Sequence, residues 1–199
     1  KIILNRGGKE ELDNSLSEIS SLTERMGLIT GQLKTFARKA PQKLAVVEIE
    51  RAMNRAIALM QPVMIAKQVR LTLSLCEDTL SIKGDEIRLE QVFVNLIGNA
   101  IDAMDTTDVK ELAVSLKKLN QTVQICIADS GIGLEPHVLD QLYDPFFTTK
   151  SDSEGLGLGL SISYGIVKDL LGHIVAENKK SGGASFTVTF PRFTNETDQ

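Results

Sequence analysis

The chain has 199 residues, of which 42% are hydrophobic and 24% charged, so one core of moderate size with an appendage is expected. Its net charge of −4 argues against a nucleic-acid binder that depends on a general basic surface. The sequence contains no apolar run long enough to span a membrane and no signal peptide. Both cysteines, Cys76 and Cys126, lie in apolar runs typical of strands, which indicates buried, reduced thiols in a cytosolic protein.

The first predicted element is one long helix over residues 9–39, which Ala40 and Pro41 end. Its apolar residues recur three or four positions apart, close to a heptad seam: Leu12, Leu16, Ile19, Leu22, Met26, Ile29, Leu33 and Phe36. Such a helix cannot bury its seam alone. Packing on its own domain is one solution, but the polar remainder of its surface favours a dimerisation helix.

The rest of the chain predicts an α/β fold, a two-layer sandwich with helices on one face of a mixed β-sheet. The expected elements are a strand at 44–47, a helix at 48–66, strands at 70–76 and 79–83, a helix at 85–104, strands at 112–119 and 122–129, a helix at 156–171 with Gly172 as its C-cap, and strands at 173–178 and 184–190. Residues 130–154 are expected to be irregular. The predicted divisions are a helical segment (1–40), the α/β domain (41–193) and a flexible tail (194–199).

The helix predicted at 85–104, with Asp85 as its N-cap, carries the most informative pattern. Its apolar residues cover most of its surface and predict a largely buried helix: Ile87, Val92, Phe93, Leu96, Ile97, Ala100, Ile101 and Met104. Three polar residues, Asn95, Asn99 and Asp102, interrupt this coat on one face. Their oxygen atoms would suit a hydrated Mg²⁺ and a phosphate. A solvent-facing stripe is an equally good interpretation at this point.

A second pattern, Asp129 to Gly133, follows a predicted strand. Two glycines, Gly131 and Gly133, allow a tight turn with a carboxylate at its root. That carboxylate can accept a hydrogen bond from an exocyclic amine such as that of adenine. Taken alone, an ordinary Asx-turn is the better interpretation.

A third pattern, Gly-Leu-Gly-Leu-Gly, opens the helix predicted at 156–171. Its glycines let backbone N–H groups approach a phosphate, and the helix N-terminus favours an anion. It matches neither a P-loop nor the dinucleotide fingerprint. Between these patterns lies a loop at 134–154, in which Phe146 and Phe147 can anchor the loop and Lys150 can reach a phosphate. A surface loop with a hydrophobic staple remains the alternative.

In this order and at these spacings, the segments resemble the ATP-binding domain of sensor histidine kinases, whose superfamily includes gyrase-type ATPases, Hsp90 chaperones and mismatch-repair ATPases. Asn95–Ala100 is similar to the N box, Asp129–Gly133 to the first glycine box, Asp144–Lys150 to the F box and Gly155–Gly159 to the second glycine box. The resemblance covers roughly residues 44–191 and implies the histidine-kinase/gyrase/Hsp90-like ATP-binding fold.

The resemblance implies that the chain binds ATP and Mg²⁺. Asn99 would bind Mg²⁺, Asn95 would hold the phosphates or the metal, and Lys150 would meet the γ-phosphate, which makes these three the implied catalytic residues. Asp129 would accept a hydrogen bond from the adenine amine. The remaining nucleotide-binding positions implied by the boxes are Asp102, Gly131, Gly133, Thr149, Gly155, Leu156, Gly157, Leu158 and Gly159.

Residues 1–40 resemble the second helix of the dimerisation and phosphotransfer hairpin of these kinases, with Leu22–Met26 and Leu33–Lys39 closest to the C4-dicarboxylate-transport sensor kinases. The family's acceptor is a histidine followed by glutamate on the first hairpin helix, but no histidine precedes His137 here. The resemblance therefore implies a catalytic fragment that phosphorylates a histidine on a helix absent from this chain, for relay to a response-regulator aspartate. Its expected partners are that acceptor helix, the response regulator and a second copy bound through the N-terminal helix. We expect a cytoplasmic domain of a parent anchored in the bacterial inner membrane.

Two other functions compete with this one. In gyrase-type relatives that hydrolyse ATP, a glutamate four residues before the metal-binding asparagine activates water. Asn95 occupies that position and cannot take a proton at neutral pH, which favours a kinase. The other competitor is a non-catalytic dimerisation module that has kept the fold, and the intact boxes count against it. His137 and His173 lie in no acceptor motif and are interpreted as structural.

Overall fold

The computed structural model describes residues 15–16, 44–76, 78–149 and 157–194. The chain divides into two compact units, Lys1–Pro41 and Gln42–Gln199. In the first unit the described residues are Ser15 and Leu16, which are helical and exposed, so most of the predicted seam lies outside the described residues. Within the described part of the chain, no helix is long and apolar enough to cross a membrane.

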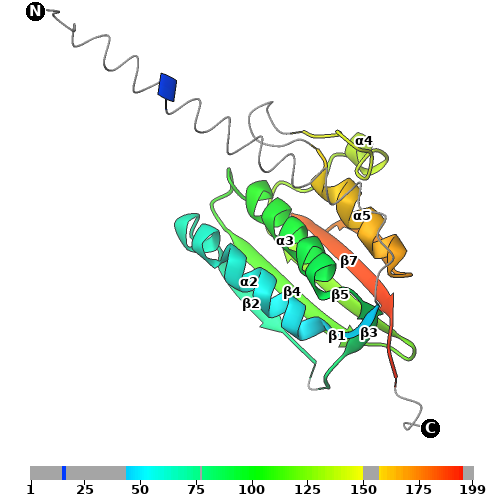
Figure 1. Ribbon diagram of the computed structural model, residues 1–199. Helices are drawn as coiled ribbons and strands as arrows, with labels where there is room; N and C mark the ends of the chain where they lie inside the picture. The colour runs from blue at the N-terminus through cyan, green and yellow to red at the C-terminus, as the bar shows by residue number, and fades with distance from the viewer. Residues whose placement is uncertain (1–14, 17–43, 77, 150–156, 195–199) are drawn as a thin grey trace, which may run out of the picture. The chain divides into compact units, whose positions relative to one another are not determined.

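The second unit has two layers, a five-stranded sheet and three helices on one of its faces (Figure 1). Its elements are β1 (Ala45–Glu48), α2 (Ile49–Ala66), β2 (Arg70–Ser74), β3 (Ser81–Gly84), α3 (Glu86–Ala103), β4 (Glu111–Lys118), β5 (Thr122–Asp129), α4 (Pro136–Leu139), α5 (Gly159–Asp169), β6 (His173–Asn178) and β7 (Ala184–Pro191). The sheet order is β2-β4-β5-β7-β6, with β2 and β4 parallel and the other pairs antiparallel, while β1 and β3 form a separate antiparallel pair. This confirms the predicted mixed sheet with helices on one face.

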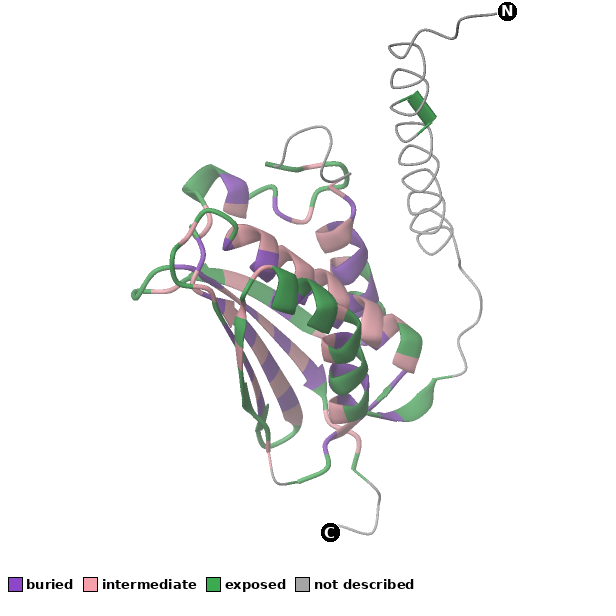
Figure 2. Cartoon of the chain, turned by 90° about the vertical axis from the view of Figure 1, so that its left-hand side faces the viewer, coloured by how far each residue is buried: buried purple, intermediate pink, exposed green. Residues whose placement is uncertain are grey.

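The sheet buries one face because its strands alternate in polarity. In β5, Val123, Ile125 and Ile127 are at most 1% exposed, and the residues between them are half-buried on the opposite face (Figure 2). Cys126 belongs to that opposite face and is half-buried, as is Cys76, and both are free thiols. The prediction of two buried cysteines was therefore wrong: Cys126 points to the face of β5 opposite the core, and Cys76 follows the end of β2 and is only partly buried against the core.

Helix α3 runs between α2 and α5 and forms the centre of the helical layer (Figure 1). The Asp85 carboxylate caps it by accepting hydrogen bonds from the N–H groups of Ile87 and Arg88, at 3.0 and 3.2 Å. Leu89, one of its core residues, is fully buried, whereas Ile87 is 75% exposed. Ile87 lies about 200° around the helix from Leu89, so its inclusion in the buried coat was wrong.

Helix α5 differs from its predicted bounds at both ends. Gly157 and Leu158 precede the helix, which starts at Gly159. At the other end Leu171, with φ of 58°, takes the left-handed position predicted for Gly172. The N–H of Gly172 instead bonds to the carbonyl of Val167 at 2.8 Å, closing a Schellman-type cap. Glycine suits position 172 because a Cβ there would lie 2.6 Å from the Phe190 ring. The short helix α4 lies within the region predicted to be irregular.

Candidate functional site

Asn95, the first residue of the polar stripe of α3, faces the start of α5. Asn95 is half-buried, and its Nδ2 donates hydrogen bonds to the carbonyl of Gly159 and to Oγ of Ser163, both at 3.1 Å. Ser163 is fully buried and donates in turn to the Gly159 carbonyl at 2.9 Å. Both amide hydrogens of Asn95 are thereby used to join the two helices. Its Oδ1 accepts no hydrogen bond from the described residues, so this oxygen has capacity for a ligand.

Asn99, one helical turn further on, is also half-buried, and its amide bonds to none of the residues that the structure describes. Because burying an amide without partners is unfavourable, this position is suited to a residue that a ligand completes. An amide oxygen is a hard ligand of the kind that Mg²⁺ accepts.

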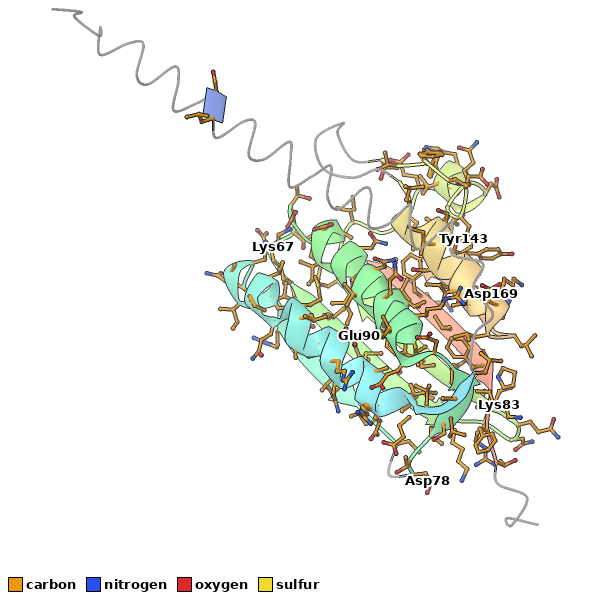
Figure 3. All side chains as sticks on the ribbon, viewed as in Figure 1. Lys67, Asp78, Lys83, Glu90, Tyr143 and Asp169 are labelled. Atoms are coloured by element: carbon orange, nitrogen blue, oxygen red, sulfur yellow. The ribbon has the colours of Figure 1, made fainter. Side chains whose placement is uncertain are left out.

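Asp102, the third residue of the stripe, has a different environment. Its carboxylate lies 3.1 Å from the ammonium of Lys67, which also reaches Asp105 at 2.8 Å. Lys67 follows α2, at the end of that helix nearest the C-terminus of α3 (Figure 3). Burial alone would lower the pKa of Lys67, but hydrogen bonds to Asp105 and Asp102 and their negative charges raise it above 10.5. Asp102 is therefore partly neutralised by Lys67, and its contact with a nucleotide stays a prediction.

Asp129 ends β5 and is 1% exposed. Its Oδ1 accepts hydrogen bonds from the N–H of Gly131 at 2.8 Å and from that of Ala184, in β7, at 3.2 Å. The first bond makes the Asx-turn that the sequence indicated, and the second ties the turn to a strand far along the chain. Oδ2 accepts no hydrogen bond from the described residues, which leaves an acceptor for an outside donor such as an amine.

The loop after Asp129 packs directly on the end of α3. The N–H of Ile132 donates to the carbonyl of Ala103 at 3.1 Å, and a Cβ at position 131 would lie 2.5 Å from that same oxygen. Gly131 is therefore required for the close approach of the two backbones. The contact brings the Asp129 carboxylate to the end of the helix that carries Asn95 and Asn99.

The F box and the second glycine box also meet. The N–H of Phe146 donates to the carbonyl of Gly157 at 3.1 Å, and Gly157 has φ of +65°. A Cβ at position 157 would collide with the carbonyl of Phe147. Phe147 packs against the core, but Phe146 is 67% exposed. One aromatic side chain anchors this loop, so the prediction that two adjacent ones could do so was too broad.

The second glycine box leads into the N-terminus of α5. Leu158, at the cap position, is 5% exposed, and its apolar side chain cannot accept hydrogen bonds from the first N–H groups of the helix. Those groups are suited to an anion such as a phosphate. Thr149 is described and exposed, whereas Lys150, Gly155 and Leu156 lie outside the described residues. His137 and His173 are both exposed.

The donor set fits Mg²⁺ held together with phosphates. Among the described residues, no group of three or more His, Cys, Asp or Glu side chains could hold a metal ion. Mg²⁺ ordinarily keeps several waters and is bound by one or two protein oxygens plus substrate phosphates. The Oδ1 atoms of Asn95 and Asn99 supply oxygens of that kind.

Several contributors to the site were not identified from the sequence. Ser163 orients Asn95 and could have been noticed from its position one helical turn after Gly159. Lys67 pairs with the α3 stripe across 35 residues of sequence and carries no local signal. Asn178 and Lys179 contact the Asp129 loop; Asn178 appeared only as the last residue of a predicted strand, and Lys179 was not singled out.

Comparison with known proteins adds independent information. Residues 84–194 match the family model described as "Histidine kinase-, DNA gyrase B-, and HSP90-like ATPase". The chain is 34% identical over 182 residues to the C4-dicarboxylate transport sensor protein DctB of Rhizobium meliloti, a match that covers 92% of this chain and 29% of that protein. The chain thus spans less than a third of the length of this relative.

Among solved structures, the catalytic domain of histidine kinase ThkA is similar with a TM-score of 0.68 and 25% identity, covering 76% of this chain and 97% of that one. Histidine kinase ThkA in complex with the response regulator protein TrrA gives a TM-score of 0.74 at 21% identity, covering 92% of this chain and 52% of that one. The second likeness concerns the fold alone.

Proposed function

The chain belongs to the histidine kinase-, DNA gyrase B- and HSP90-like ATPase family, with sensor histidine kinases as its relatives, and on this premise we propose that it is the catalytic part of such a kinase. It binds Mg-ATP and transfers the γ-phosphate to a histidine on a helix outside these 199 residues. The phosphohistidine then supplies a response-regulator aspartate. The known complex of a kinase of this fold with a response regulator supports that partner.

The observation that carries the proposal is the meeting of distant segments on α3. Asn95 bonds to Gly159 at the start of α5, and the loop after Asp129 bonds to Ala103 at the end of α3. A nucleotide lying along this part of α3 would place its base near Asp129 and its phosphates near the N-terminus of α5.

The described residues have distinct roles in this mechanism. Oδ2 of Asp129 accepts a hydrogen bond from the adenine amine, and the first N–H groups of α5 receive phosphate oxygens. Oδ1 of Asn99 would hold Mg²⁺, and Oδ1 of Asn95 would help to hold the metal or the phosphates. When bound, the metal would neutralise phosphate charge, and the protein holds the nucleotide in position for transfer. Charge neutralisation and positioning are most of what phosphoryl transfer requires. We assign Lys150 to the γ-phosphate and Thr149, Gly155 and Leu156 to nucleotide contacts by resemblance.

Hydrolysis of ATP is disfavoured by the residue type at position 95. By resemblance, Asn95 occupies the position of the water-activating glutamate of gyrase-type relatives, and an amide does not take a proton at neutral pH. Its N–H groups are also committed to Gly159 and Ser163. No side chain at position 95 can therefore deprotonate a water molecule near the γ-phosphate, which leaves the acceptor histidine as the expected nucleophile.

The domain divisions of the sequence complete the proposal. We propose that residues 1–40 correspond to the second helix of a dimerisation hairpin, 41–193 to the catalytic domain and 194–199 to a tail; residues 1–40, apart from Ser15 and Leu16, lie outside the described residues. The heptad seam of residues 9–39 supports a homodimer, and the match to only 29% of the length of DctB supports a longer parent protein. The acceptor helix and the membrane anchor of that parent are proposed from the family resemblance.

The test is phosphotransfer to a separately supplied hairpin that carries the acceptor histidine. With labelled ATP and Mg²⁺, the chain should label that hairpin with an acid-labile phosphate, as expected for a phosphoramidate. Incubated without the hairpin, it should neither label itself nor hydrolyse ATP appreciably. Rapid multiple-turnover hydrolysis by the chain, or acid-stable labelling of its own Ser or Thr residues, would falsify the proposal.

A further inference from the structure

The turn between β6 and β7 lies directly at the Asp129 loop because of the sheet register. Ala128 of β5 pairs with Ser185 of β7, so β5 ends where β7 begins. The turn that precedes β7 is therefore brought to the same edge of the sheet. It is closed by two backbone hydrogen bonds, from Lys179 N–H to Gly183 O at 2.9 Å and from Gly182 N–H to Lys179 O at 3.1 Å.

This turn holds the start of the loop. The half-buried Lys179 donates from Nζ to the backbone carbonyl of Asp129 at 2.8 Å, and the N–H of Ala184 donates to Oδ1 of the Asp129 carboxylate at 3.2 Å. A Cβ at position 183 would collide with the Asp129 carbonyl, so the two backbones are in direct contact. Both the main chain and the carboxylate of Asp129 are thus fixed by residues more than 45 positions away.

The last residue of β6, at the entry to this turn, holds the end of the loop. Oδ1 of Asn178 accepts the N–H of Leu134 at 2.7 Å, and Nδ2 of Asn178 donates to the carbonyl of Leu134 at 2.6 Å. One planar amide therefore satisfies both backbone groups of a residue, as a neighbouring strand would. Gly133, with φ of +78°, precedes this contact, and a Cβ there would lie 2.9 Å from Oδ1 of Asn178.

We propose that the β6–β7 turn is the support of the first glycine box, with Asn178 and Lys179 as positioning residues for recognition of the adenine base. The inference rests on the proposed function, because it assumes that Oδ2 of Asp129 receives the base amine. Neither residue needs to touch the nucleotide. Together they fix the loop at both ends, while Gly131 packs against α3 in its middle. The direction of the Asp129 carboxylate follows from these three contacts.

The experiment compares calorimetric affinities for ATP and for inosine triphosphate, whose base has an oxygen in place of the exocyclic amine. The wild-type chain should prefer ATP, and Asp129→Asn should remove most of that preference. Asn178→Ala and Lys179→Met should each weaken ATP binding about tenfold while changing binding of the inosine nucleotide much less. Lys179→Arg, which keeps a cationic donor, should restore the preference. Lys180→Met is the matched control, because Lys180 is exposed on the same turn and makes no hydrogen bond or ion pair with a described residue.

Hydrogen exchange gives a second readout, since the N–H of Leu134 should lose protection in Asn178→Ala without nucleotide. Equal weakening of both nucleotides would overturn the inference, because a merely structural role predicts that result. Unchanged affinities in folded variants would overturn it as well. If Asn178→Ala does not fold, Lys179→Met and Lys179→Arg decide the matter. A wild-type chain that bound no ATP would remove the proposed function and this inference with it, a result that differs from loss of the preference alone.

Discussion

The base end and the metal end of the site differ in how their polar groups are satisfied. At the base end, Asp129 is 1% exposed, and its backbone and carboxylate accept hydrogen bonds from Lys179, Gly131 and Ala184. At the metal end, the amide hydrogens of Asn95 are held by Gly159 and Ser163, but Asn99 is half-buried and bonds to no described residue. We infer that the residues that recognise the base are already in place before the nucleotide binds, whereas the metal site is completed by the metal ion and the phosphates of the nucleotide.

The largest effect is expected at the metal end. Asn99→Ala should lower phosphotransfer to the supplied hairpin by more than about a hundredfold, because it deletes an oxygen ligand of the ion that offsets phosphate charge. Its melting temperature should change little, since no hydrogen bond with a described residue is lost. Asn54→Ala, at an exposed helical position of α2, is the control and should leave both quantities unchanged. A folded Asn99→Ala protein with normal transfer would contradict the asymmetry between the two ends.

A smaller effect is expected from disturbing the packing at the base end. Gly131→Ala should lower the free energy of unfolding by about 1–3 kcal/mol, because its Cβ would lie 2.5 Å from the Ala103 carbonyl. Gly165→Ala is the matched control on α5, where a Cβ meets nothing within 4 Å. That variant should be more stable than wild type by about 0.5–1 kcal/mol. Denaturant unfolding measures the stability of both variants. Equal effects of the two substitutions would show that the loop after Asp129 is not packed against α3.

The smallest effect concerns the ion pairs at the end of α3. Lys67→Met should cost below about 1 kcal/mol at pH 7, because Lys67, Asp102 and Asp105 all keep substantial contact with solvent. The folded-state pKa of Lys67 lies above its ordinary value of 10.5, so the stabilisation is present below that pH and is lost as pH rises through the folded pKa. The stability difference between wild type and variant should therefore shrink in that alkaline range. Lys117→Met, at an exposed position of β4, is the matched control for the removal of a surface lysine.

Much of the fold could be predicted from periodicity, because burial on one face repeats locally. The strands β6 and β7 and the helix α3 appeared close to their observed bounds, and Asp85 was correctly placed as a cap. Two of the errors, Ile87 and Gly172, arose because a hydrophobic residue or a glycine was judged by its type alone. Ile87 is exposed because it points away from the core side of α3. Position 172 is a glycine because a Cβ there would meet the Phe190 ring, and not because the residue adopts a left-handed conformation.

The candidate site divides in the same way. Asn95, Asn99 and Asp129 could be proposed because their residue types and spacings recur in a known family. Ser163 could have been noticed from its position near Gly159, but Asn178 and Lys179 could not, because they act through contacts 44 and 50 positions away. Such contacts depend on the register of the sheet, which one sequence does not contain.

The central claim is a base end formed in advance and a metal end that the ligand completes. It is tested most directly by calorimetry with adenosine and with ATP, each in the presence and absence of Mg²⁺. We expect Mg²⁺ to leave the affinity for adenosine unchanged and to raise the affinity for ATP. Asn99→Ala should abolish only the effect of Mg²⁺ on the affinity for ATP. Adenosine binding that required Mg²⁺, or a Mg²⁺ effect on ATP that persisted in Asn99→Ala, would contradict it.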